Sequence, residues 1–307
     1  MRHAGPGPQT AGGPRRAPGG VAQPAPEAPA TTGAPDTGAP DSEALDTEAL
    51  DAESAVGTDV VIDAGTGRRS WRALVYQLLG ILAVLLGLVG WLLVADLSPA
   101  ELTTLSPAAL SAHTLEHLQL TLLSAAIVLA VAIPLGVALT RKSLRFLSGP
   151  VLVLANVGQA APSIGLVVLL AFWLGFGFWA AVIALVLYGV LPVLRNTMVG
   201  LQHVDQRLVE AGRGMGMTAA AVLFKVELPM AVPIMLAGIR TALVLLVGTA
   251  ALATFINGGG LGILITTGVQ LNLPAVLVVG SLLVALLALF IDWVGRVVEH
   301  VARPKGL

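Results

Sequence analysis

The sequence contains no cysteine among its 307 residues. Disulfide bonds, thiolate catalysis, cysteine-ligated zinc and iron–sulfur clusters are therefore excluded. The phosphate-binding motif G-x-x-x-x-G-K-[ST] is also absent, so we do not expect the chain to hydrolyse nucleotide by itself.

Charged residues are scarce as well, at 11% of the chain, where a soluble domain carries about 25%. Hydrophobic residues make up 56%, and six runs contain no Asp, Glu, Lys, Arg or His: 73–95, 118–140, 150–173, 177–194, 241–256 and 274–291. A helix of 23 residues, the length of the first run, is about 34 Å long, enough to cross a hydrocarbon core of about 30 Å. Only helices and closed barrels satisfy their backbone in lipid. We therefore predict an all-α integral membrane protein with six transmembrane helices, in contact with the lipid bilayer.

The basic residues lie on one side of this predicted topology. Of the 17 Lys and Arg, 3 lie in residues 1–67, and the other 14 lie at Arg240 or in the segments 68–72, 141–149, 195–231 and 296–307. The intervening loops carry Asp96, Glu101 and Glu116 and no basic residue. The positive-inside rule then predicts a multi-pass protein of the cell membrane with both termini in the cytoplasm.

The N-terminal region differs in composition from the rest. Residues 1–67 are rich in Pro, Ala, Gly and Thr and hold ten acidic residues against three Arg, a composition typical of a disordered tail. We predict four parts: a disordered acidic cytoplasmic tail (1–67), an additional first transmembrane helix with its outer loop (68–112), a transmembrane domain (113–299) and a cytoplasmic C-terminal tail (300–307).

The predicted spans hold no charges at their centres, where proton relays and ion-coupled carriers place them. Uphill transport would therefore need energy from a partner. An intramembrane enzyme is also disfavoured, because its catalytic groups would have to lie at this depth. We expect no catalytic residue, no cofactor and no nucleic-acid partner.

The segment His113–His117 reads H-x-x-E-H, which is the inverted zinc-protease signature. No third ligand is evident near it. A helix start with interfacial histidines explains the pattern better, and we predict no metal site.

The longest loop on the basic side, residues 204–233, has the signals of two short helices. Asp205 can cap a first helix, which the glycines at 212, 214 and 216 interrupt. Thr218 can cap a second helix that is predicted to end at Leu228-Pro229. A short, stiff element of this kind could pass force from a soluble partner to the spans, and an ordinary amphipathic loop is the alternative.

This loop resembles the coupling loop of permeases of binding-protein-dependent ABC importers. Those permeases carry E-A-A, three residues, Gly, nine residues, a β-branched residue, one residue and Leu-Pro, and this chain matches with Glu210-Ala211-Gly212, Gly216, Val226 and Leu228-Pro229. The resemblance implies a type I ABC importer permease-like core whose loop docks into a separate cytoplasmic ATPase subunit. The coupling residues that it implies are Asp205, Glu210, Ala211, Gly212, Gly214, Gly216, Val226, Leu228 and Pro229. It also implies an extracytoplasmic substrate-binding protein and a second permease subunit, identical or homologous.

Three further stretches narrow the resemblance. MGMT (215–218), LFKVELP (223–229) and AGIRTA (237–242) look like the osmoprotectant branch, whose members import glycine betaine, carnitine and choline. The alternative is a permease for methionine-like or other small polar nutrients, and a membrane scaffold or receptor without transport is a further possibility. Aromatic cages hold quaternary ammonium ions. With 5% aromatic residues here, we expect that cage in the binding protein.

A few polar residues are candidates for the translocation path. Polar side chains within lipid face protein or water. The candidates are Asn156, Gln159, Pro162 and Ser163 in the third span and Thr249 and Thr254 in the fifth. Gluing helices together is the alternative role. The run 258–262 (GGGLG) lies on the side opposite the basic loops, and we predict a re-entrant turn or close helix packing there.

Overall fold

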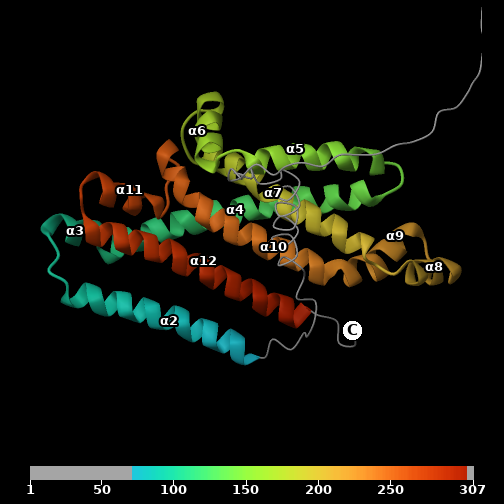
Figure 1. Cartoon of the computed structure of the whole chain (residues 1–307), viewed down its shortest axis with the longest axis horizontal. Helices are drawn as coiled ribbons and strands as arrows, with labels where there is room; N and C mark the ends of the chain where they lie inside the picture. Colours follow the sequence, from blue (N-terminus) through green and yellow to red (C-terminus); the bar gives the residue numbers. More distant parts are fainter. Residues whose placement is uncertain (1–70, 303–307) are drawn as a thin grey trace, which may run out of the picture. The chain divides into compact units, whose positions relative to one another are not determined.

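The structure, a computed structural model, describes residues 71–302. The predicted disordered tail and most of the predicted C-terminal tail lie outside them. Every regular element within this range is a helix, as predicted. Five helices are long and apolar enough to cross a membrane (Figure 1): α2 Trp71–Val94, α4 Pro107–Thr140, α7 Phe178–Gln202, the run Ala219–Ile256 that contains α10 Leu228–Ala250, and α12 Pro274–Ala302.

The third predicted span is not one straight helix. It consists of α5 Ser148–Ala160 and α6 Ser163–Leu174, which meet at an angle of 100°. Proline has no N–H to donate and disfavours a helical conformation in the preceding residue, and Ala161 has ψ 140 just before Pro162. The described residues hold six candidate spans only if this bent pair counts as one.

Three other boundaries differ from those predicted. The expected loop before residue 118 contains a short helix, α3 Pro99–Thr104, and its second half belongs to α4, which begins at Pro107. Helix α4 passes without a break through residues 112 and 113. The loop predicted at 257–273 contains a helix, α11 Gly262–Gln270. Helix α12 continues to Ala302, well past the charge-free run.

The core lies between α4, α7 and α10, whose inward faces are apolar and closely packed. Leu120 and Val128 of α4, Leu185 and Leu194 of α7, and Leu246 of α10 are all at most 2% exposed. Small residues permit the close approach, as they do in other membrane bundles. At Gly238 of α10, an added Cβ would lie 2.4 Å from Cβ of Asn196 in α7.

Helix α2 lies beside α12 (Figure 1). Trp293 donates from Nε1 to the carbonyl oxygen of Leu74 (2.9 Å), and Gln77 donates from Nε2 to Asp292 (3.1 Å). These polar contacts join the helix that was predicted as an addition to the rest of the bundle.

Candidate functional site

The loop between α7 and α10 forms a compact element, called here the coupling segment (residues 205–229). It holds α8 Gln206–Gly214, the short α9 Ala219–Val222 and a π-turn, Leu223–Glu227, that leads directly into α10. Both predicted caps are present, since Asp205 accepts from the N–H of Arg207 (2.9 Å) and Thr218 accepts from that of Ala221 (3.2 Å). The segment lies at one end of the bundle (Figure 1), called here the α8 end.

The turn between the two helices depends on one glycine. Gly216 has φ +83, a left-handed conformation that L side chains rarely adopt. Gly212 and Gly214, predicted to interrupt the helix, instead lie within α8. Gly212 is buried, and an added Cβ would lie 3.4 Å from Cγ2 of Val222. That distance is an ordinary van der Waals contact, so a Cβ would fit at 212, and of the three glycines Gly216 forms the turn.

Leu228-Pro229 begins a helix instead of ending one. These two residues are the first of α10. The backbone remains helical through the π-turn before them, so residues 219–256 form one continuous helical run. The coupling segment is thus rigidly continuous with a membrane span.

The coupling segment has a buried face and an exposed face. Val209 and Val222 pack with Leu201, Val204 and Met235 in one apolar cluster. Glu210, Ala211 and Gly216 are exposed on the other side. So are two large apolar side chains, Met215 (72% exposed) and Phe224 (68%).

An ion pair that the sequence did not suggest anchors this segment. Arg141, at the end of α4, donates from Nη1 to Oε1 of Glu227 (3.2 Å), and its Nη2 contacts Oε2 of the same carboxylate. The Glu227 side chain is 9% exposed. The two residues are 86 positions apart in the sequence, so only the fold brings them together.

The predicted path residues lie in two places: four at or just before the break between α5 and α6, and two near the end of the helical run 219–256. Pro162 and Ser163 lie at the α5–α6 break, and Asn156 and Gln159 lie on α5 just before it. Thr254 lies in a 3-10 turn, Ala251–Ile256, that packs against α6. Thr249 donates its hydroxyl to the carbonyl oxygen of Leu245 within its own helix (2.7 Å).

Comparison with known protein families identifies the family to which the chain belongs. The model of one family, described as binding-protein-dependent transport system inner membrane component, matches residues 132–303, more than half of the chain and all of the coupling segment. The chain belongs to this family of permeases.

Curated relatives and solved structures agree with this assignment. The permease is 43% identical over 192 residues (62% of this chain, 88% of the relative) to the glycine betaine/carnitine/choline transport system permease protein OpuCB of Bacillus subtilis (strain 168). It is 39% identical over 203 residues (64% and 94%) to the osmoprotectant import permease protein OsmW of Salmonella typhimurium. An inward-facing structure of the MetNI methionine ABC transporter has a TM-score of 0.55 at 25% identity, covering 64% of this chain and 96% of that one. The predicted type I importer permease fold is confirmed.

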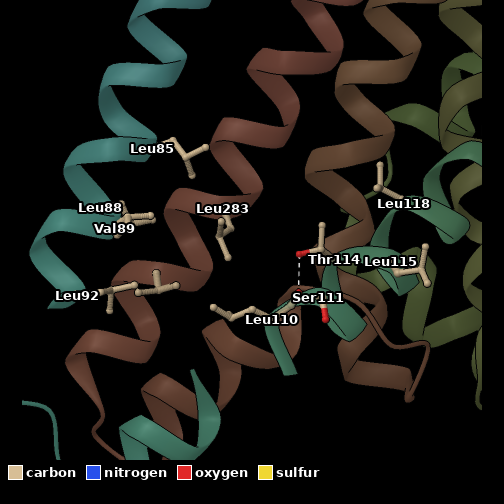
Figure 2. A pocket seen from close by; sticks show the side chains of 11 residues that line it. Leu85, Leu88, Val89, Leu92, Leu110, Ser111, Thr114, Leu115, Leu118 and Leu283 are labelled. Carbon is tan, nitrogen blue, oxygen red and sulfur yellow. Dashed lines mark hydrogen bonds between the residues drawn. The ribbon is translucent and has the colours of Figure 1, made fainter. Parts of the chain in front are cut away.

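An apolar groove of about 470 Å³ lies between α2, α4 and α12 of the permease (Figure 2). Its lining is leucine and valine except for Ser111 and Thr114. Both hydroxyls bond to backbone oxygens of their own helix, Ser111 to Ala108 (2.9 Å) and Thr114 to Leu110 (2.7 Å). A groove without an aromatic ring or a free polar group in its lining does not suit a quaternary ammonium ion, so the substrate path is not assigned to it.

At the opposite end from the coupling segment, the H-x-x-E-H motif and the glycine run contact each other. Glu116 accepts from the N–H of Gly260 (3.0 Å), and Nδ1 of His117 accepts from that of Leu261 (3.3 Å). His117 is fully buried, so the prediction that both histidines are interfacial is wrong for it. Within residues 71–302 no group of three metal-binding side chains occurs. The glycine run is a turn that closely approaches α4, one of the two structures predicted for it.

Proposed function

We propose that this permease imports osmoprotectants of the glycine betaine, carnitine and choline type, delivered by an extracytoplasmic binding protein and driven by a separate ATPase. The observation that carries the proposal is its 43% identity to a permease named for these three substrates. A choline permease of Bacillus subtilis at 41% and a carnitine permease of Listeria monocytogenes at 38% support the same class. The methionine transporter is less similar, at 25% identity, which argues against methionine-like nutrients.

The ATPase is proposed to dock on the exposed face of the coupling segment. Glu210, Ala211 and Gly216 of the family motif lie on that face, while Gly212 and Val226 face inward or partly inward. The apolar side chains of Met215 and Phe224 are suited to enter a pocket of a protein partner. When two ATPase subunits close on ATP, they would then push α10, because the coupling segment leads directly into that span.

The charges of this docking site also support an orientation in the membrane. The α8 end carries Arg207, Arg213 and Lys225, as a cytoplasmic surface does under the positive-inside rule. We therefore place the coupling segment and both termini in the cytoplasm, and the α3 and α11 end outside, facing the binding protein.

A second permease, identical or homologous, is proposed to cover α5. No residue of this helix is buried, and Val153, Leu154 and Val157 are each more than 60% exposed. Asn156 is exposed among them, a polar group that in lipid needs protein or water beside it. The path would then run between the two subunits past Asn156, Gln159 and the α5–α6 break.

The test is gentle purification of the tagged full-length chain from its native membrane, with identification of the proteins that accompany it. An ATPase and a binding protein that binds glycine betaine or choline, and not methionine, would support the proposal. If neither accompanies the chain even after crosslinking, a scaffold or receptor without transport becomes the better reading.

A further inference from the structure

Arg141 lies at the point where α4 gives way to α5. It is the residue after the last helical position of α4, with ψ 144, and its carbonyl oxygen accepts from the N–H of Leu144 in the following turn. A short 3-10 turn, Arg145–Leu147, then leads into α5. A displacement of Arg141 would therefore be passed to the helix that carries Asn156 and Gln159.

Glu227 occupies the corresponding position on the coupling segment. It is the last residue of the π-turn, immediately before α10, and both of its oxygens contact the guanidinium of Arg141. A two-pronged arginine–carboxylate contact fixes direction as well as distance, because both groups are planar. Nε of Arg141 is buried and has no hydrogen-bond partner among residues 71–302.

The ion pair extends an apolar contact along one face of α4. Ile133, Val137 and Arg141 are spaced four apart and so lie along the same face of the helix. Ile133 and Val137 pack against the apolar cluster that contains Val209 and Val222 of the coupling segment. The end of α4 thus packs against this cluster through two apolar side chains and contacts Glu227 of the coupling segment through one charged pair.

We propose that Arg141 and Glu227 are positioning residues, which transmit the displacement of the coupling segment to the α4–α5 junction and from there to the substrate path. This inference rests on the proposed function, since it requires that an ATPase moves the segment. The covalent route through α10 enters the fifth span, whose far end packs against α6 through the 3-10 turn Ala251–Ile256. The ion pair adds a second route to α5, so its loss would uncouple ATP hydrolysis from uptake and leave hydrolysis itself intact.

The experiment uses the full-length permease, reconstituted in liposomes with its ATPase and binding protein, and measures glycine betaine uptake per ATP hydrolysed. Arg141→Glu and Glu227→Arg each replace the attraction with repulsion, and we expect each to lower this ratio about fivefold or more. The double variant restores the pair in reverse order and is expected to recover most of the ratio. Lys142→Glu is the matched control, because Lys142 is exposed and has no ion pair with any described residue.

The outcomes separate this inference from the proposed function. If the wild-type complex shows no ATP-dependent uptake, the proposed function fails, whatever the variants do. If the wild type transports and the single variants keep its ratio, or the double variant recovers nothing, the inference is overturned. A proportional fall of hydrolysis and uptake would indicate a merely structural pair and also overturn it. Arg141→Lys keeps the positive charge but loses the two-pronged guanidinium contact, so it is predicted to have an intermediate ratio. This variant tests the inference if the charge-reversed variants do not insert into the membrane.

Discussion

Nδ1 of His117 accepts a hydrogen bond from the backbone N–H of Leu261, 144 residues further along the chain. Because that nitrogen accepts, the proton of the neutral ring is on Nε2, which lies 3.0 Å from the carbonyl oxygen of Val247 and donates to it. One side chain of α4 thereby holds both α10 and the turn before α11. The H-x-x-E-H motif is a structural clamp in this protein.

Replacing His117 with alanine should destabilise the permease. The buried N–H of Leu261 and the carbonyl of Val247 would lose their partner, at a cost of about 1–3 kcal/mol for each group left unsatisfied. Thermal unfolding of the purified protein measures the effect. His113→Ala, a partly exposed histidine of the same motif, should change the melting temperature little, and an equal effect of the two changes would contradict the clamp.

Replacing Gly216 with valine should abolish uptake without preventing insertion into the membrane. A valine at φ +83 is strained, so the turn between α8 and α9 would be deformed and the exposed face of the coupling segment displaced. Uptake and membrane abundance are measured together. Gly87→Val on α2 is the control, since an added Cβ there meets nothing within 4 Å, and normal uptake by Gly216→Val would remove the turn from the coupling role.

Gly238→Ala should lower stability by about 1–3 kcal/mol, the usual cost of overpacking a core. The new Cβ would lie 2.4 Å from Cβ of Asn196 and 2.7 Å from the carbonyl oxygen of Pro192, so α7 and α10 would have to move apart. Gly248→Ala, in the same helix but with open space around it, should be neutral. Similar melting temperatures for both variants would contradict this prediction, because the interface between α7 and α10 would then accommodate the added methyl group without loss of stability.

Glu101 should give the permease a stability that depends on pH. Hydrogen bonds from the backbone and side chain of Ser98, and then from the backbone of Ala275, hold the pKa of this carboxyl below its usual value of 4.5. A lowered folded-state pKa means that the stabilisation is present above about pH 4.5 and is lost as the pH falls through the folded-state value.

The check is the melting temperature between pH 7 and pH 3 for the wild type and Glu101→Gln. The wild type should lose more stability on acidification, because the glutamine cannot titrate. Asp96→Asn, at an exposed position near α3, should follow the wild-type profile. Parallel curves for wild type and Glu101→Gln would mean that the Glu101 contact contributes no stability.

Local patterns in the sequence determined the class of this protein and its coupling segment. Apolar runs of span length, the caps Asp205 and Thr218, and the glycine at 216 act through their own few neighbours along the chain, so they could be interpreted without a structure. The resemblance that they supported led to the correct family. The proline at 162 was visible too, but the 100° bend at this proline was not expected within a run that carries no charge.

Contacts between distant residues were decided by the tertiary structure alone. The sequence places Glu101 in a loop, yet its carboxylate accepts from the N–H of Ala275, 174 residues away, at the start of α12. Arg141 and Glu227 each read as ordinary charges at the membrane surface until the fold joins them. Such pairs form because the packing of α4, α7, α10 and α12 excludes water, so these polar groups bond to the partners that the fold brings beside them. That condition exists only once the helices have assembled.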